Sequence, residues 1–472
     1  MSHFVVIGGG PGGYVAAFAA ARAGMDVTII EKEAIGGTCL NKGCIPTKTL
    51  KSSAEALQTA KRLAEFGING CDTPQVDMTA VVGRKEKVRG VLVTGLEKAC
   101  AALKIRLVKG HGELLGSGKI KVHLADGVEE ISADHILIAT GSDNLALPSL
   151  PVDHKHIVTS DDALNLTHVP QRVVVVGGGV IGCEFAFILR EFGSEVTIVE
   201  GQNRLLPLPS VDEDISKLLQ REAKKSKIQT ELAATVESAT VRPDGVVECA
   251  IGPSPFVENS KAKEKVLEAD LVLVSVGRVP VTEGLGLAAA GVEVDKRGWI
   301  QVDERLRTTA KGVYAIGDAL GPLKVMLAHV ASAEGLCVVA DCMGKGYDMD
   351  YAVIPSGIFT TPEIGTVGLS EAQAVAAGHE VVTNTFQFRE LGKAQAMAEL
   401  PGLFKVIADA KNGKVLGVHI AGAHATDLIA EATLAMKMGA TVNDIAKTIH
   451  AHPTLAEGLW EAVMPLAEKL NA

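Results

Sequence analysis

The sequence contains few of the features that mark secreted, membrane or nucleic-acid-binding proteins. Its eight cysteines in 472 residues are too few for a disulfide-stapled secreted protein. No apolar run reaches the roughly 18–20 residues of a membrane helix, and the first expected strand, at residues 4–7, starts too early to follow a signal peptide. The net charge of −10 argues against nucleic acid, whose phosphates need clustered Lys and Arg. We therefore expect a cytoplasmic enzyme that contacts neither nucleic acid nor a membrane.

Glycine, by contrast, is abundant, and the glycines mark an internal repeat. Residues 5–31 read VVIGGGPGGYVAAFAAARAGMDVTIIE, and residues 174–200 read VVVGGGVIGCEFAFILREFGSEVTIVE. Each copy has an apolar strand, a Gly-rich turn, a helix, a second strand and a final Glu. This is the pattern of a dinucleotide-binding βαβ unit. The sequence therefore predicts an α/β protein with two Rossmann-like domains.

The two copies offer the same residue types to a dinucleotide. The first glycine allows the tight turn, the second lets the backbone approach a pyrophosphate at a helix N-terminus, and the third lets helix and strand pack closely. The terminal carboxylate can accept a hydrogen bond from a ribose. The first copy supplies Gly8, Gly10, Gly13 and Glu31, and the second supplies Gly177, Gly179, Gly182 and Glu200.

Two such sites suggest two nucleotides, one of which hands electrons to the other. Glu200 favours NAD over NADP, because a carboxylate repels a 2′-phosphate. Arg204 lies nearby and tempers this inference, but we expect it to be a surface residue on a turn.

Cys39 and Cys44 lie in the segment GGTCLNKGCIPTK. On a regular helix, residues five apart lie too far from each other to form a disulfide. Gly43 and Pro46 supply a break and a helix start. A thiol at a helix N-terminus is partly ionised at neutral pH, as thiol exchange requires. A metal site is a poor alternative, because no further Cys or His pair nearby completes a set of four ligands.

Cys337 and Cys342 provide an internal control with the same spacing. They lie in AEGLCVVADCMG, an unbroken helical pattern, where they should point apart and remain inert thiols. Spacing alone is therefore a weak signal, and the Gly and Pro around Cys39 and Cys44 make the difference.

With these motifs, the sequence resembles the FAD-dependent pyridine nucleotide–disulfide oxidoreductases from end to end, and within them the dihydrolipoamide dehydrogenases. GGTCLNKGCIPTK is one of its most specific signatures. The resemblance implies that Cys39 and Cys44 form a redox-active disulfide that passes electrons through FAD to NAD. It also implies four domains: FAD-binding at 1–142, NAD-binding at 143–270, a central domain completing the FAD site at 271–344, and a C-terminal α+β dimerisation domain at 345–472.

The resemblance extends to individual residues of the two nucleotide sites. Asp318 would bond the flavin ribityl chain, and Lys48, paired with Glu184, would lie beside the reactive flavin edge. A buried ammonium there would stabilise the anionic reduced flavin and would need a partner charge. The further residues that would line the FAD site are Gly37, Thr38, Gly112, Thr140, Gly141 and Ala328, and Gly277 would join the NAD site.

The segment HAHPTLAE at 450–457 resembles the family's HxHPTxxE motif. His452 would be the acid/base that takes a proton from the substrate dithiol, and Glu457 would orient its imidazole. His450 is expected to be structural. The family is a homodimer in which each active site borrows this His from the other subunit, and the bond before the Pro is cis.

Several alternatives remain. Glutathione-reductase-like enzymes have a Tyr where this chain has Val180, typically Ala where it has Gly182, and Arg residues for the NADP phosphate. Mercuric and large thioredoxin reductases use extra C-terminal cysteines or selenocysteine, whereas no Cys follows Cys342. A catalytically silent structural subunit is the alternative of a different class. Lys42 and Thr47 depart from the usual residues of the disulfide loop, and Lys42 could shift the potential of the thiols.

We expect no N-terminal lipoyl domain, so the lipoyl group would come from a partner. The candidates are the lipoyl-bearing acyltransferase of a 2-oxoacid dehydrogenase complex and the lipoyl carrier of glycine cleavage. We expect no metal among the cofactors.

Overall fold

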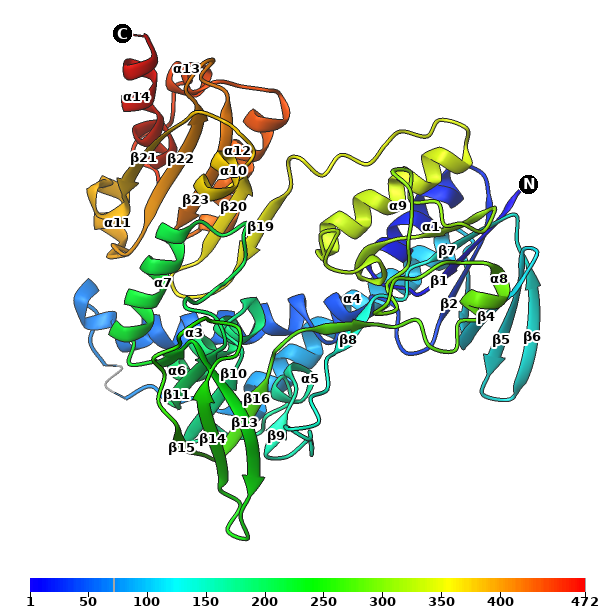
Figure 1. Cartoon of the computed structure of the whole chain (residues 1–472), viewed down its shortest axis with the longest axis horizontal. Helices are drawn as coiled ribbons and strands as arrows, with labels where there is room; N and C mark the ends of the chain where they lie inside the picture. The colour runs from blue at the N-terminus through cyan, green and yellow to red at the C-terminus, as the bar shows by residue number, and fades with distance from the viewer. Residues whose placement is uncertain (71–72, 472) are drawn as a thin grey trace. The chain divides into compact units, whose positions relative to one another are not determined.

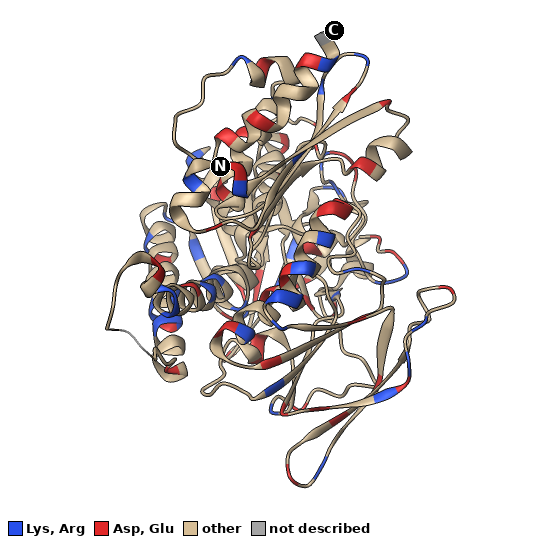
Figure 2. Ribbon diagram, turned by 90° about the vertical axis from the view of Figure 1, so that its left-hand side faces the viewer, with Lys and Arg blue, Asp and Glu red and all other residues tan. Residues whose placement is uncertain are grey.

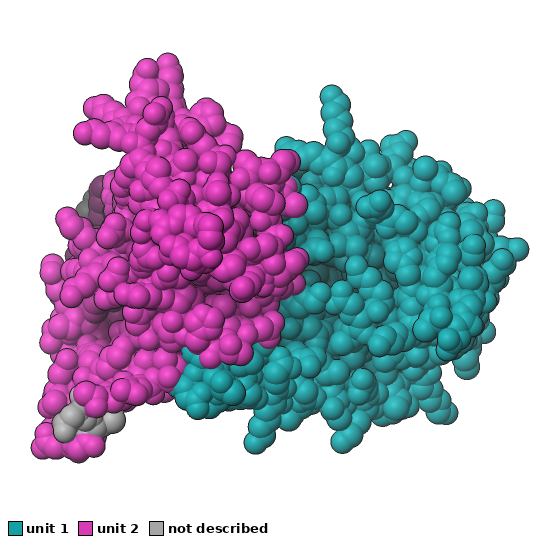
Figure 3. Space-filling model, turned by 90° about the horizontal axis from the view of Figure 1, so that it is seen from below, with its two compact units in different colours: residues 1–50, 77–145, 277–351 teal, residues 51–76, 146–276, 352–472 magenta. Residues whose placement is uncertain are grey.

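The structure is a computed structural model that describes residues 1–70 and 73–471. The described chain divides into two compact units, each made of segments that are far apart in the sequence (Figure 3). Unit 1 consists of residues 1–50, 77–145 and 277–351, and unit 2 of residues 51–76, 146–276 and 352–472.

A parallel sheet forms the centre of unit 1 (Figure 1). Its strands, from one edge to the other, are β18 (Val313–Ala315), β7 (His135–Ile138), β1 (His3–Ile7), β2 (Asp26–Glu31) and β3 (Arg106–Lys109). The interior strands are apolar runs without alternation, as expected where helices cover both faces of a parallel sheet. Strand β18 comes from the segment expected to complete the first nucleotide site, so this part of the chain joins the sheet of residues 3–138.

Helices and small antiparallel sheets surround this sheet. The helices of unit 1 are α1 (Pro11–Arg22), α2 (Gly37–Asn41), the start of α3 (Cys44–Lys61), α4 (Met78–Ala102), α8 (Leu287–Ala290) and α9 (Ala328–Cys342). A 3-10 turn, η2, spans Gly317–Leu320. Strands β4 (His111–Gly116), β5 (Lys119–Leu124) and β6 (Gly127–Ser132) form one antiparallel sheet, and β8 (Ser142–Asn144) pairs with β17 (Arg278–Pro280).

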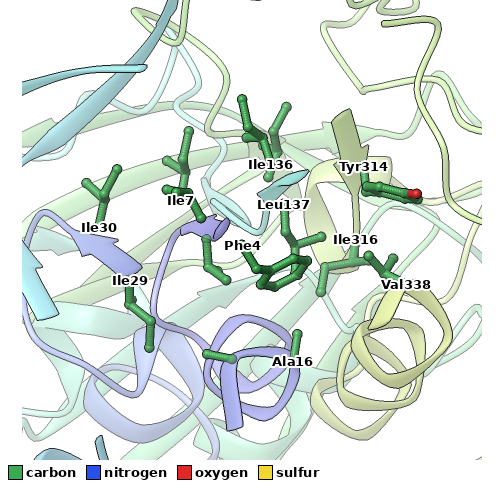
Figure 4. Packing of buried hydrophobic residues seen from close by; sticks show 14 of the residues in the cluster. Phe4, Ile7, Ala16, Ile29, Ile30, Ile136, Leu137, Tyr314, Ile316 and Val338 are labelled. Carbon is green, nitrogen blue, oxygen red and sulfur yellow. The ribbon is translucent and has the colours of Figure 1, made fainter. Parts of the chain in front are cut away.

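The hydrophobic core of unit 1 lies between the parallel sheet and the helices α1 and α9 (Figure 4). Phe4 and Leu137 are fully buried and face Ala16 of α1 and Val338 of α9. The two helices approach closely: a Cβ atom added to Gly335 of α9 would lie 2.7 Å from the carbonyl oxygen of Gly12 in α1. This packing holds the N-terminus of α1 at the carboxyl end of β1.

Unit 2 contains a second parallel sheet of the same kind. Its strands are β12 (Gln229–Leu232), β11 (Glu195–Glu200), β10 (Arg172–Val176), β16 (Leu271–Val274) and β9 (Ile157–Val158). Helices α5 (Ser160–Ala163), α6 (Val180–Phe192) and α7 (Glu213–Lys225) accompany it. Strands β13 (Ala234–Val241), β14 (Val247–Pro253) and β15 (Lys265–Ala269) form an antiparallel sheet, and residues 254–264 connect β14 to β15.

The C-terminal part of unit 2 is an antiparallel sheet packed against helices. The strand order is β19 (Pro355–Ile358), β20 (Ile364–Gly368), β23 (Val415–Ala421), β22 (Leu403–Asp409) and β21 (Val381–Gln387). The helices of this part are α10 (Glu371–Ala376), α11 (Gly392–Met397), α12 (Ala425–Lys437), α13 (Val442–Ala446) and α14 (Glu457–Asn471), and the 3-10 turn η3 (Phe388–Glu390) lies between β21 and α11. A second 3-10 turn, η1 (Leu63–Phe66), lies elsewhere in the unit. The predicted α/β class with a C-terminal α+β part is confirmed.

Lys and Arg are interspersed with Asp and Glu along the chain rather than gathered in one block (Figure 2). Among the residues that the structure describes, no helix is both long and apolar enough to cross a membrane.

Candidate active site

The Gly-rich turn between β1 and α1 has the geometry that the sequence predicts. The N–H of Gly8 donates to the carbonyl of Ile30 at 2.8 Å, so the turn is tied to the neighbouring strand. Gly8 has a φ of +106°, and a Cβ there would collide with the carbonyl oxygen of Ala139. Only glycine fits this position, because L-residues avoid that region of φ. Helix α1 then starts at Pro11 with Gly10 as its N-cap, and no side chain caps its first N–H groups.

The carboxylate of Glu31 is fixed by the backbone of this turn. Its two oxygens accept hydrogen bonds from the N–H groups of Gly9 at 2.7 Å and Glu33 at 2.8 Å. The segment after β2 folds back onto the same turn, because a Cβ on Gly37 would lie 2.6 Å from the Cα of Gly10. The structure thus brings Gly10, Glu31 and Gly37 together.

The ends of neighbouring strands complete the surroundings of the turn. The hydroxyl Oγ1 of Thr140 is buried and has no hydrogen-bond partner among the described residues. Gly112 in β4 lies against the side chain of Ile7, since a Cβ there would be 3.2 Å from that residue. Thr38 lies in α2, Gly141 precedes β8, Asp318 lies in η2, and Ala328 opens α9, all of them in unit 1. The Thr140 hydroxyl, which has no partner among the described residues, and the N-terminus of α1 suit a dinucleotide. Such a ligand would supply a hydrogen-bond partner for the hydroxyl and a phosphate for the helix N-terminus.

The second copy repeats this geometry in unit 2. The N–H of Gly177 donates to the carbonyl of Val199 at 2.8 Å, and Glu200 accepts from the N–H groups of Gly178 at 2.6 Å and Gln202 at 2.7 Å. Gly182 packs directly onto the carbonyl of Gly177.

Gly179 is the N-cap of α6, and a Cβ built on it would meet no atom within 4 Å. The protein itself therefore does not require glycine at this position, whereas a pyrophosphate placed against the backbone would. Gly277 lies in unit 1, while Gly177, Gly179, Gly182 and Glu200 lie in unit 2.

Cys39 and Cys44 are brought into contact across a break between two helices. Cys39 lies in α2, which ends at Asn41, and Cys44 is the first residue of α3. Their thiols are hydrogen-bonded to each other. Cys39 is half-buried and Cys44 is exposed. The expected break at Gly43 is confirmed, and it lets two residues five positions apart meet, which a continuous helix would prevent.

The electrostatics at Cys39 differ from the expectation of a partly ionised thiol. The hydrogen bond to Cys44 raises the pKa of Cys39, and burial raises it further. The positive charge of Lys48, one helical turn after Cys44, lowers this pKa only in part. Burial and the nearby sulfurs also raise the pKa of Tyr14. In the dithiol form Cys39 therefore keeps its proton, because contact with a second thiol outweighs the ammonium.

Lys42, one of the two residues that depart from the usual sequence of the disulfide loop, forms an ion pair with Glu33 at 2.7 Å. Both side chains are about half exposed, so the extra positive charge is largely compensated and screened.

The control pair behaves as predicted. Cys337 and Cys342 both lie in the unbroken helix α9. The thiol of Cys337 donates to the carbonyl of Tyr347 at 3.1 Å, and burial raises the pKa of Cys342 to about 11. Both residues thus lie in one continuous helix, although their spacing equals that of the first pair, and their lack of reactivity stays a prediction.

Lys48 and Glu184 lie in different units, so their ion pair stays a prediction. The side chain of Glu184 is only 4% exposed, although it lies on an apolar helix. Its Oε1 accepts the N–H of Phe359 at 2.9 Å, which ties α6 to the turn between β19 and β20.

The HxHPTxxE segment forms a His–Glu pair at the start of α14. The Nδ1 of His452 lies 2.8 Å from Oε1 of Glu457, and Oε2 of Glu457 accepts the N–H of Thr454 at 2.8 Å. These two hydrogen bonds hold the pKa of Glu457 below its ordinary value. The imidazole of His452 is 77% exposed, and the peptide before Pro453 is cis, as expected.

His450, in contrast, has a buried side chain and partners on both ring nitrogens. Its side chain is 7% exposed, and its two ring nitrogens lie 2.7 Å from Glu431 and 3.0 Å from the carbonyl of Thr448. The different exposure of the two histidines matches their predicted roles.

Three residues around Asp318 were not singled out from the sequence. The carboxylate of Asp318 accepts the hydroxyl of Ser142 at 2.7 Å, and that hydroxyl accepts from Arg278 at 2.6 Å. On the other side, Glu334 of α9 accepts the N–H of Gly317 at 2.6 Å. Ser142 and Arg278 each follow a glycine at the end of a strand, which is the signal that could have found them. Across residues 1–70 and 73–471, no cluster of three or more His, Cys, Asp or Glu side chains could hold a metal ion.

Comparison with known proteins gives consistent matches over the whole chain. Residues 2–335 match the family described as pyridine nucleotide-disulphide oxidoreductase, and residues 354–463 match its dimerisation domain. A mitochondrial dihydrolipoyl dehydrogenase of Pisum sativum is 40% identical over 98% of this chain and 91% of that protein. A dihydrolipoyl dehydrogenase of Haloferax volcanii is 39% identical over 98% and 95%. Among solved structures, LpdA from Mycobacterium tuberculosis matches with a TM-score of 0.90 and 28% identity, covering 99% of this chain and 100% of that one.

Proposed function

Because the chain belongs to the pyridine nucleotide-disulphide oxidoreductase family, we propose that it is a dihydrolipoyl dehydrogenase that uses FAD and NAD. The observation that carries this proposal is the contact between the Cys39 and Cys44 thiols, in the same unit as the first Gly-rich turn. The identity of about 40% to dihydrolipoyl dehydrogenases over nearly the whole chain favours this activity over a glutathione-reductase-like one.

The residues of unit 1 fit FAD. Gly8, Gly10 and Gly13 shape the turn for its pyrophosphate, Glu31 is aimed by two backbone N–H groups, and the buried hydroxyl of Thr140 lacks a protein partner among the described residues. We propose that Gly37, Thr38, Gly112, Gly141, Asp318 and Ala328 line the rest of this site. In unit 2, Gly177, Gly179, Gly182 and Glu200 offer the same features to NAD, and we propose that Gly277 completes that site. The flavin, when bound, supplies a two-electron acceptor that passes hydride to NAD⁺.

The thiol chemistry uses residues of this chain. His452 takes a proton from one thiol of the dihydrolipoyl group. The resulting substrate thiolate attacks the sulfur of Cys39 in the Cys39–Cys44 disulfide. The Cys39–Cys44 bond breaks, and a bond between the substrate sulfur and Cys39 forms. The second substrate thiol then attacks this mixed disulfide and closes the lipoyl ring, leaving Cys39 and Cys44 as thiols. Cys44 would be the thiol that passes the electrons to FAD when the cofactor is bound.

Two further groups support these steps. With Nδ1 held by Glu457, the other ring nitrogen of His452 is the one that accepts the substrate proton, and Glu457 stabilises the resulting imidazolium. Lys48, one turn after Cys44, places a positive charge near the thiols, and Glu184 is its proposed partner.

We propose a homodimer in which His452 of one subunit serves the active site of the other. The match of residues 354–463 to a dimerisation domain supports this arrangement, as does the exposed imidazole of His452. The partner would be a lipoyl-bearing acyltransferase of a 2-oxoacid dehydrogenase complex or the lipoyl carrier of glycine cleavage. The cytoplasmic location stays a prediction.

NADH formation from dihydrolipoamide and NAD⁺ tests the proposal. We expect Cys44→Ser to lose this activity while retaining FAD, because the electron path through the pair is broken. Cys342→Ser is the matched control, since it makes the same change in the equally spaced pair of α9 and should keep the activity. Undiminished turnover in Cys44→Ser, or a preference of the wild type for glutathione disulfide with NADPH, would contradict the proposal. A wild type that binds FAD but turns over no disulfide would indicate a catalytically silent subunit.

A further inference from the structure

A buried carboxylate that the thiol chemistry does not use lies beside Asp318. The side chain of Glu334, in the middle of α9, is fully buried. One of its oxygens accepts the N–H of Gly317 at 2.6 Å, and the other accepts the hydroxyl of Tyr351 at 2.6 Å. All three residues belong to unit 1. A buried carboxylate is costly unless it is hydrogen-bonded, so both contacts are needed to keep it there.

Gly317 is the residue directly before Asp318 in η2. It has a φ of +67°, and a Cβ there would lie 3.1 Å from the Cβ of Ala331 in α9. The turn is therefore pressed against the helix that carries Glu334. The hydrogen bond from the N–H of Gly317 to Glu334 fixes the Ile316–Gly317 peptide, which directly precedes the peptide that leads into Asp318.

The side chain of Asp318 is held by a second set of contacts, from Ser142 and Arg278. Its Oδ2 accepts the hydroxyl of Ser142 at 2.7 Å. Arg278 fixes this hydroxyl, since its Nε donates to Ser142 Oγ at 2.6 Å and its Nη2 donates to the carbonyl of Ser142 at 2.7 Å. Among the described residues, Oδ1 of Asp318 receives no protein donor, so it remains available to a ligand hydroxyl.

The groups around Glu334 have opposing effects on its pKa. Burial raises the pKa of Glu334, while Tyr351, the N–H of Gly317 and the ammonium of Lys324 oppose this rise. The Nζ of Lys324 also lies over the ring of Tyr351, 4.7 Å from its centre, and this cation–π contact helps to hold the tyrosine in place.

We propose that Glu334 and Tyr351 are positioning residues that fix the Gly317–Asp318 turn and thereby aim the carboxylate of Asp318 at the hydroxylated chain of the flavin cofactor. Neither residue touches the reacting atoms. The inference rests on the proposed function, because it takes Asp318 to be a ligand of FAD.

The two tyrosines beside α9 allow a matched test. Tyr351 donates to Glu334, and Tyr314 donates to Asp341 of the same helix at 3.0 Å. The ring of Tyr314 is buried and that of Tyr351 is partly buried, and only the carboxylate that Tyr351 contacts reaches the turn of Asp318. We expect Tyr351→Phe to weaken FAD binding by about threefold to tenfold, the effect of one lost hydrogen bond to a positioned carboxylate, and Tyr314→Phe to change it by less than about twofold.

The measurement is the dissociation constant of FAD, determined by equilibrium dialysis of the holoenzyme with detection of flavin fluorescence. Equal affinities of Tyr351→Phe and Tyr314→Phe would overturn the inference. A wild type that binds no FAD would instead overturn the proposed function, and the inference with it, so the two failures are distinguishable.

A double-mutant cycle separates positioning from a general loss of stability. If Tyr351 acts through Asp318, Tyr351→Phe should add less than about twofold to the weakening caused by Asp318→Asn. The visible absorption bands of the bound flavin should shift in both single variants and not in Tyr314→Phe. Additive losses of affinity would contradict action through Asp318.

Discussion

The chain builds one strand–turn–helix–strand unit twice, at residues 3–31 and at residues 172–200, and the two copies agree closely in their backbone. Their paired strands have the same register at an offset of 169 residues. The first glycine of each turn, Gly8 or Gly177, has a φ of +106° or +103° and donates a hydrogen bond of 2.8 Å to the neighbouring strand. The turn geometry is therefore set by the repeated residues alone, whatever surrounds each copy.

The helices of the two copies differ in what they bury. At the position where α1 has Val15, α6 has Glu184, a carboxylate that is 4% exposed. Helix α1 packs against α9, with Gly12 in close contact with that helix, whereas α6 uses Glu184 to hold the N–H of Phe359. The turn is therefore common to both copies, while the helix after it differs in the contacts that it makes within its own unit.

The largest effect is expected from breaking each turn separately. In Gly8→Val or Gly177→Val, the new Cβ would collide with the carbonyl oxygen of Ala139 or of Ser275, and a β-branched residue strongly disfavours this φ. We expect Gly8→Val to lose bound FAD. We expect Gly177→Val to retain FAD but to lose about 10²-fold or more in kcat/KM for NAD⁺, because the nucleotide is misplaced. Flavin content and steady-state kinetics measure the two outcomes, and loss of FAD from Gly177→Val would contradict the independence of the copies.

Removing the carboxylate that distinguishes α6 should have a smaller effect. Glu184→Val makes this position match Val15 of the first copy and takes away the acceptor of the Phe359 N–H. We expect a loss of about 1–3 kcal/mol in the free energy of unfolding, measured in urea. Glu184→Gln keeps an acceptor oxygen and should lose less than half as much. Equal losses in the two variants would show that charge, rather than the hydrogen bond to Phe359, accounts for the stability.

Much of this arrangement can be predicted from the sequence, because it depends on local patterns. Each Gly-rich repeat has the strand–turn–helix–strand order that its sequence predicts, with strands at residues 3–7 and 26–31 and at residues 172–176 and 195–200. The contrast between Cys39–Cys44 and Cys337–Cys342 follows from Gly43, which breaks one helix where the other continues.

The remaining features depend on contacts between distant parts of the chain. Ser142 meets Asp318 across 176 positions, and Lys405 lies buried among Asp212, Asp214 and Glu371. No local spacing encodes such pairs. The raised pKa of Cys39 was missed for a similar reason, since the helix N-terminus is visible in the sequence and the contact of the two thiols is not.

Glu31 and Glu200 allow the functions of the two copies to be separated by a milder change. Each carboxylate accepts two backbone N–H groups, and a glutamine has only one acceptor oxygen, so one amide would lose its partner. We expect Glu31→Gln to weaken FAD binding about tenfold and Glu200→Gln to raise the KM for NAD⁺ about tenfold. A tenfold effect of Glu200→Gln on FAD binding, measured by dialysis, would contradict the assignment of the second copy to NAD.

The smallest effect on nucleotide preference is expected from replacing Arg204, which lies just after the second repeat. The glycine between the first and second glycines of the motif packs against a residue after the terminal Glu. Gly9 lies against Ile35 and Gly178 against Leu205, which is one position further along the chain than the offset of 169 residues predicts. Arg204 falls in this inserted stretch.

The guanidinium of Arg204 donates to the carbonyls of Val211 at 3.0 Å and Leu208 at 2.8 Å. It is therefore engaged in holding its own loop rather than positioned for a 2′-phosphate. We expect Arg204→Ala to lower the free energy of unfolding by about 1 kcal/mol and to change the preference for NAD⁺ over NADP⁺ by less than about twofold. The ratio of kcat/KM for the two nucleotides measures this preference, and a change of about tenfold would place Arg204 in the nucleotide site. Because Glu200 repels a 2′-phosphate whether or not Arg204 is present, the preference should depend on the repeated carboxylate and not on the arginine beside it.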